Sequence, residues 1–185
     1  MNKIFLYTFL FFLFCGNAIA DTKDREIKLD QLFEQLKKSS NASVAFEIEM
    51  KIWNIWSTHP TQKELTQSLA NGSNLMSQGK LEKSYKVFST IIDVAPNWAE
   101  GWNKRATVFY LMGRFNESEE DILQTLKLEP RHFGALSGQG LIRMALEDWS
   151  GAITVLEAGM RIHPHMPGVI RNLEYVRKKQ KESMT

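Results

Sequence analysis

The chain has 185 residues, with 23 Lys and Arg against 21 Asp and Glu, which gives a formal net charge of +2. This near balance lacks the strongly basic footprint of a nucleic-acid-binding protein, so we expect no nucleic acid among its partners. The single cysteine is Cys15, which leaves the chain after it without a disulfide, a thiol nucleophile or a thiolate metal site.

The first twenty residues have the pattern of a secretory signal peptide. Lys3 supplies a positive charge, residues 4–14 form an unbroken apolar run, and residues 18–20 (Ala-Ile-Ala) are a small-x-small cleavage site. We therefore expect cleavage after Ala20, a mature N-terminus at Asp21, and a periplasmic or secreted location. The apolar run is too short to span a bilayer comfortably, so we expect membrane contact only through this segment before cleavage.

Residues 21–62 predict two helices without the repeat pattern that follows them. Apolar residues recur at helical spacing from Ile27 onward, and a second helix is expected over about residues 41–57. This second helix, which includes Trp53 and Trp56, is apolar around so much of its circumference that more than one side should be buried. Two interpretations stay open: a degenerate first repeat that packs on the next one, or an aromatic contact surface that supports self-association.

Three prolines stand 34 residues apart, at Pro96, Pro130 and Pro164. Self-similarity at a fixed period of this size indicates a repeat architecture. Three further columns share the period: Gly72, Ala106 and Gly140; Gly79, Gly113 and Glu147; and Ser84, Ser118 and Ala152. We therefore predict three helix-turn-helix units, at residues 65–98, 99–132 and 133–166.

Two of these columns have a role in packing. Helices that cross closely need small residues where their backbones approach, and the pairs are Gly72 with Ser84, Ala106 with Ser118, and Gly140 with Ala152. Gly79 and Gly113 are placed at interhelix turns, where a positive φ costs glycine little. The third unit has Glu147 at that position, so we expect its turn to differ slightly. Residues 167–185 predict a capping helix and tail, which close the hydrophobic end of the array.

At these columns the chain resembles the tetratricopeptide repeat (TPR) family. The strongest stretch is Trp98–Ala106, followed by Leu111–Phe115 and Leu128–Pro130. The chain is also similar to small TPR proteins of Gram-negative bacteria that carry signal peptides. The resemblance implies an all-α TPR solenoid and a non-catalytic adaptor, because TPR proteins bind peptides or protein segments in a concave groove built mainly by the first helix of each repeat.

The resemblance also implies which residues line that groove. They are Leu69, Ser73 and Met76 in the first repeat, Glu100, Asn103, Thr107 and Tyr110 in the second, and Gly134, Ser137, Gly138, Leu141 and Met144 in the third. Chaperone-binding members of the family place Lys, Asn and Arg here to clamp a C-terminal carboxylate. The corresponding columns of the third repeat hold Gly134 and Gly138, so no such clamp is expected. The implied partner is a protein or peptide segment.

Other chemistry is not favoured by the sequence. Gly134 and Gly138 share a helix face, which either admits a ligand chain or gives room to a bulky neighbour such as Tyr110. His132 and His163 lie in corresponding inter-repeat loops and are interpreted as surface residues, because no thiolate or convincing carboxylate accompanies them as a zinc ligand. No catalytic motif or cofactor fingerprint is present, so we expect no enzyme activity, cofactor or metal. The competing function is an accessory protein that binds a small molecule or a cell-wall glycan.

Overall fold

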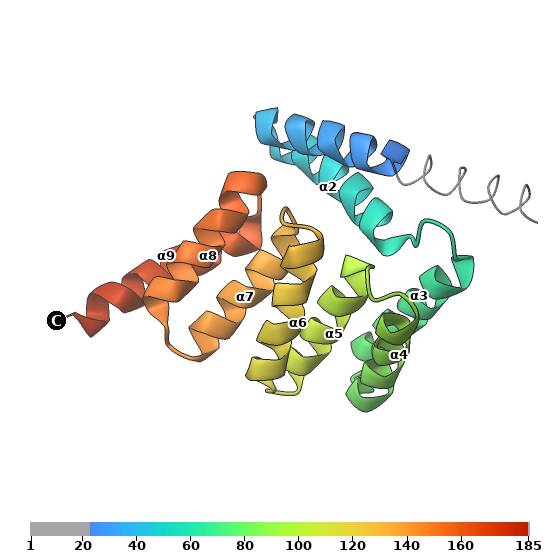
Figure 1. Ribbon diagram of the computed structural model, residues 1–185. Coiled ribbons are helices and arrows are strands. Elements are labelled where there is room, and N and C mark those ends of the chain that lie inside the picture. The colour runs from blue at the N-terminus through green and yellow to red at the C-terminus, as the bar shows by residue number, and fades with distance from the viewer. Residues whose placement is uncertain (1–22, 185) are drawn as a thin grey trace, which may run out of the picture.

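The computed structural model describes residues 23–184, and the predicted signal peptide and the N-terminus at Asp21 lie outside the described residues. Within that range helices are the only regular secondary structure (Figure 1). The first spans residues 23–38. The others are α2 (Ala42–Ser57), α3 (Lys63–Ser77), α4 (Leu81–Val94), α5 (Ala99–Leu111), α6 (Phe115–Leu128), α7 (Phe133–Ala145), α8 (Trp149–Ile162) and α9 (Pro167–Ser183).

Three helical hairpins, α3/α4, α5/α6 and α7/α8, stack side by side, and α9 packs on α8 at the end of the array (Figure 1). The predicted all-α solenoid is confirmed. A cluster that includes Val169, Leu173 and Val176 of α9 together with Leu156 of α8 closes the C-terminal end of the core. No helix within residues 23–184 is long and apolar enough to cross a membrane.

The predicted helix crossings are present in each hairpin. The Ser84 hydroxyl donates to the carbonyl of Gly72 at 2.8 Å, and the Ser118 hydroxyl donates to the carbonyl of Ala106 at 2.7 Å. A Cβ atom at Gly72 would collide with the ring of Phe88. In the third hairpin, where Ala152 replaces the serine, a Cβ at Gly140 would collide with the side chain of Leu156. Small residues are therefore required because side chains of the second helix pack directly on the backbone of the first.

The three interhelix turns share one backbone conformation. Gly79 and Gly113 have φ values of +70° and +73°, and Glu147 adopts φ 57° at the equivalent position. The expectation that the third turn would differ is therefore wrong at the level of the backbone. A non-glycine residue in the left-handed region costs about 1–2 kcal/mol, and Asp148 offsets part of that cost because its side chain caps α8 by accepting from the amide of Gly151.

The two N-terminal helices lie across the inter-repeat loops (Figure 1). Asn41 caps the start of α2 by accepting from the amides of Ser43 and Val44. From there α2 runs past the ends of the hairpins instead of stacking on α3 and α4 as a further repeat. Its inner face joins a hydrophobic cluster with the helix over residues 23–38 and with Phe133 at the start of α7. The part of the apolar face that includes Ile48, Ile52 and Trp56 is thus buried on two sides, as predicted, whereas Val44, Phe46 and Met50 on the rest of it are 48%, 60% and 50% exposed.

One position of the repeat supplies many of the contacts between α2 and the inter-repeat loops. The residues two positions after each repeat proline are Trp98, His132 and Met166. The indole of Trp98 donates to the carbonyl of Trp56 at 2.8 Å, and the ring of His132 stacks on the Trp56 indole at 4.1 Å between centroids. Met166 packs against the same cluster. The 34-residue period therefore positions not only the hairpins but also the contacts that hold the N-terminal helices.

Candidate functional site

Helices α5 and α7 form a pocket of about 180 Å³ from residues that the sequence assigned to the groove. Seven of the predicted residues line it: Asn103, Thr107 and Tyr110 from α5, and Gly134, Ser137, Gly138 and Leu141 from α7. Ala106, Ser118, Ile122 and Ala135 line the remainder. The first helices of two consecutive repeats thus bring together side chains that are about one repeat apart in sequence.

The remaining predicted groove residues lie elsewhere. Leu69 is only 3% exposed and belongs to the core between α3, α4 and α5, where Met76 also packs. Met144 packs against the core cluster of α8 and α9. Ser73 is half-buried, and its hydroxyl donates to the carbonyl of Leu69 at 2.9 Å. The candidate site is therefore concentrated in the second and third repeats.

Three of the five polar side chains that line the pocket are already hydrogen-bonded within the protein. The Thr107 hydroxyl donates to the carbonyl of Asn103, and the Ser118 hydroxyl donates to that of Ala106. The amide of Asn103, a residue only 7% exposed, donates to a carboxylate oxygen of Glu100 at 3.1 Å. These bonds leave mainly apolar surface for a ligand.

Gly134 and Gly138 have different environments although they lie one turn apart. A Cβ at Gly134 would come within 2.6 Å of the Trp53 ring, so this glycine gives room to a bulky neighbour, one of the two alternatives, but that neighbour is Trp53 of α2 and not Tyr110. A Cβ at Gly138 would meet only Ile122, at an ordinary 3.6 Å. The Trp53 ring therefore occupies the space beside Gly134, and the backbone at Gly138 stays open.

A buried ionic cluster lies beside the Trp53 ring. Glu100, expected in the groove, is instead 1% exposed; its carboxylate lies 3.0 Å from Nε2 of His132 and 3.1 Å from Nζ of Lys104. Burial disfavours the charged form of Glu100, but the hydrogen bond with His132 and the positive charge of Lys104 outweigh it and lower the pKa of the carboxyl. Glu100 therefore has a structural role as an anion beneath α2.

The loop histidines are buried, and the expectation that they are surface residues is wrong. His132 and His163 are both 0% exposed. They do not converge, because His163 Nε2 pairs with Glu49 of α2 at 3.1 Å while His132 pairs with Glu100. The hydrogen bond from His163 outweighs partial burial and lowers the pKa of Glu49. No group of three or more metal-ligating side chains gathers within residues 23–184.

Sequence reasoning missed the histidines and Arg131 as the residues that hold the N-terminal helices. His165 Nε2 lies 2.7 Å from the carbonyl oxygen of Ser39, and Arg131 bonds Asp30 of the first helix and Glu129. The sequence feature that could have identified these residues is their position, since each stands within two positions of Pro130 or Pro164. Loops that recur at one edge of a solenoid lie in a row, and a polar residue in each of them indicates a partner along that row.

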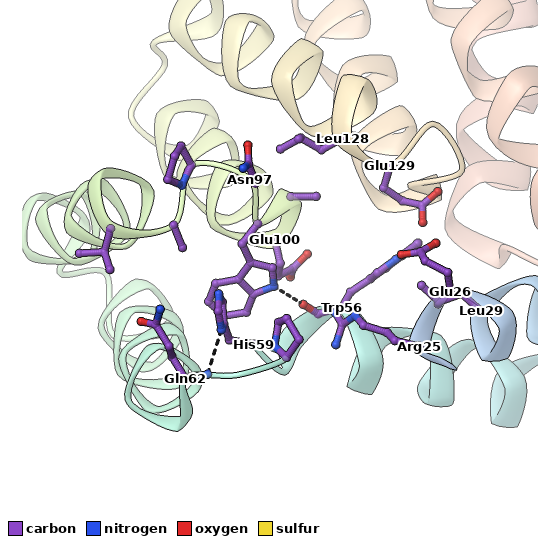
Figure 2. A pocket seen from close by; sticks show the side chains of 16 residues that line it. Arg25, Glu26, Leu29, Trp56, His59, Gln62, Asn97, Glu100, Leu128 and Glu129 are labelled. Carbon is purple, nitrogen blue, oxygen red and sulfur yellow. Dashed lines mark hydrogen bonds between the residues drawn. The ribbon is translucent and has the colours of Figure 1, made fainter. Parts of the chain in front are cut away.

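A second pocket, of about 440 Å³, lies where the first helix and the end of α2 meet the loops after α4 and α6 (Figure 2). Trp56 and His59 line it together with Glu100 and Glu129 (Figure 2). Trp98 also lines it and is buried, packed edge-on against His59. Burial, and then the positive charge of Arg25, lowers the pKa of His59, which favours the neutral form of this imidazole.

Stacked helical hairpins with a 34-residue period and a capping helix define a TPR solenoid. A TPR repeat-containing protein of Rhizobium etli is 33% identical over 153 residues, a match that covers 77% of this chain and 71% of the relative. The chain therefore belongs to the TPR repeat-containing proteins. No protein-family model matches it.

Solved TPR domains share the fold at lower identity. The Sgt2 TPR domain from Aspergillus fumigatus superposes with a TM-score of 0.63 at 22% identity, over 66% of this chain and 82% of that domain. The first TPR of Spaghetti (RPAP3), bound to an HSP90 peptide, gives 0.61 at 19% identity over 63% and 93%. The Yersinia enterocolitica type III secretion chaperone SycD, in complex with a peptide of the translocator YopD, gives 0.59 at 14% identity over 65% and 97%.

Proposed function

We propose that this protein is an exported, non-catalytic TPR scaffold that binds a protein or peptide segment in the groove between α5 and α7. The observation that carries the proposal is the pocket between these helices, in which seven predicted groove residues meet beside an open backbone at Gly138. Two structural relatives support it, because the RPAP3 domain and SycD are each described with a bound peptide. An extended or helical segment could lie along the inner helices as in other groove complexes.

The groove is tested by partner capture with the mature chain. Tyr110→Ala removes a ring and hydroxyl at the pocket, and Gly138→Arg places a long side chain where the backbone is open. We expect both variants to lose captured protein while their helical circular dichroism stays near that of the parent. Lys178→Glu on the exposed side of α9 is the control and should retain capture. Capture that survives both groove changes would contradict the proposal.

The proposed export is tested separately. The positive, apolar and small-x-small regions of residues 1–20 support cleavage after Ala20. Intact-mass measurement of protein purified from the native cell envelope should give a chain that begins at Asp21. A mass that retains residues 1–20 would contradict export with cleavage and would leave the groove proposal standing.

One observation favours a second candidate, the binding of a small molecule or glycan fragment. The pocket beneath the first helix, at about 440 Å³, falls in the range of roughly 300–1,000 Å³ typical of small-molecule sites. Because Trp56 and Trp98 line it, a bound ligand should change tryptophan fluorescence. Titration with solubilised cell-wall glycan fragments tests this, with Val94→Arg at the exposed rim as the blocking variant. No saturable change in the parent, or the same change in the variant, would reject it.

A further inference from the structure

We infer that the pocket between α5 and α7 holds one aliphatic side chain of the bound segment, from a Leu, Ile, Val or Met, and does not hold a carboxylate. This inference rests on the proposed function of the groove and specifies its partner. Three features of the pocket carry it: its charge, its hydrogen bonding and its size.

No charged side chain is among the described residues that line the pocket. The basic residues closest to them in sequence, Lys104 and Arg105 on α5 and Arg143 on α7, are each paired with an acidic side chain, Glu100, Asp121 and Glu119 respectively. A carboxylate entering this pocket would lose water without gaining a cation, which is unfavourable for a desolvated charge. The charge of the pocket therefore matches an uncharged group.

The hydrogen bonds of the pocket point to an apolar group in particular. The Thr107 and Ser118 hydroxyls are bonded to backbone carbonyls of α5, and the Asn103 amide is bonded to Glu100. The remaining floor is formed by Ala106, Ile122, Ala135 and Leu141. Polar groups that are already satisfied offer a ligand little, whereas the apolar floor gains by being covered. Tyr110 and Ser137, both half-buried, are left at the rim, where backbone groups of the segment would pass.

The size of the pocket limits the occupant to one side chain. At about 180 Å³ it is smaller than the roughly 300–1,000 Å³ that encloses a drug-sized ligand. The space beside Gly134 on α7 is already occupied by the Trp53 ring. The segment as a whole would therefore lie outside the pocket along α5 and α7, anchored by one residue.

A displayed library of random twelve-residue peptides tests the inference, with both free and blocked C-termini, selected on the mature chain. Groove binders are defined as those lost on Gly138→Arg. We expect them to share one aliphatic position, to tolerate a blocked C-terminus, and to lose about tenfold or more in affinity when that residue is changed to Asp or Gly. Groove binders that require an acidic residue or a free carboxylate would overturn the inference while the groove function stands. A library without groove binders would overturn both.

Variants of the pocket lining distinguish a specific fit of the anchor side chain from nonspecific hydrophobic binding. Leu141→Ala enlarges the pocket, so the preferred anchor should shift toward Phe. Ser137→Leu narrows it, so the preference should shift toward Ala or Val. The two changes act in opposite directions on one property, and an unfolded variant produces neither shift. An anchor preference that stays the same in whichever variant folds would overturn the assignment of this pocket.

Discussion

Glycines 134 and 138 provide a matched test of how α2 sits on the repeats. Both lie in α7, one turn apart, and we change each separately to alanine. At Gly138 the new Cβ meets Ile122 at an ordinary 3.6 Å, so the substitution mainly improves helix propensity and should stabilise by about 1 kcal/mol. At Gly134 the Cβ would lie 2.6 Å and 2.9 Å from two atoms of the Trp53 ring, which forces the ring or α2 to move.

The expected cost at Gly134 follows from this overlap. Overpacking of a filled site costs about 1–3 kcal/mol. Replacing a mid-helix glycine by alanine gains about 1 kcal/mol in helix propensity, and the gain at Gly134 is smaller because this residue lies in the first turn of α7. We therefore expect a net destabilisation of about 1–2 kcal/mol. The two variants should differ by about 2–3 kcal/mol, which is on the order of 1 M in urea midpoint for a slope near 2 kcal/mol/M.

Equilibrium urea unfolding followed by circular dichroism measures this difference. Trp53→Phe removes the ring atoms that overlap, so the Gly134→Ala change should cost less in that background, and the double-mutant cycle isolates the contact. Equal stabilisation by the two alanines, or no coupling between positions 53 and 134, would refute the position of α2 across the repeats.

Three further predictions test the packing, the turns and the buried charges. Ala106→Leu should destabilise by about 1–3 kcal/mol through overpacking at the helix crossing, whereas Lys86→Leu on the exposed face of α4 should change the urea midpoint little; equal midpoints would place the crossing elsewhere. Glu147→Gly should raise the free energy of unfolding by about 0.5–1 kcal/mol, because relief of the left-handed strain exceeds the added flexibility of the unfolded chain; a lower urea midpoint would contradict it. The lowered pKa values of Glu100 and Glu49 give stability that is present above the ordinary pKa of 4.5 and is lost as the pH falls through the lower, folded value. Urea midpoints between pH 7 and pH 3 should therefore fall less steeply for Glu100→Gln than for the exposed control Glu82→Gln, and parallel curves would contradict this.

The repeat architecture was predictable because its constraints are local and recur. Gly72, Ala106 and Gly140 are small for the same steric reason in each hairpin, and each proline ends a helix at the same place. The third turn was mispredicted because Glu147 gives no sign in the sequence that it adopts a positive φ. Its conformation is imposed by the two helices on either side, which must form the same hairpin as in the other repeats.

The placement of the N-terminal helices depends on contacts between distant segments, which spacing alone does not reveal. The partner of Glu49 is His163, 114 positions away, and the room at Gly134 is filled by Trp53. For the same reason the sequence found the pocket residues of α5 and α7 but placed Glu100 and Leu69 in the groove as well. The depth of a helix position depends on what covers that helix, and here α2 covers the start of α5.

The central proposal, that the inner face of α5 and α7 binds a protein segment, is tested most directly by photocrosslinking in the cells that make this protein. A photoreactive phenylalanine at position 110 should give a discrete adduct with another protein, and Gly138→Arg in the same chain should abolish it. The same group at position 86, on the exposed face of α4, should give no such adduct. Equal adducts from positions 86 and 110, or an adduct at position 110 that persists in the Gly138→Arg chain, would contradict a groove-bound partner.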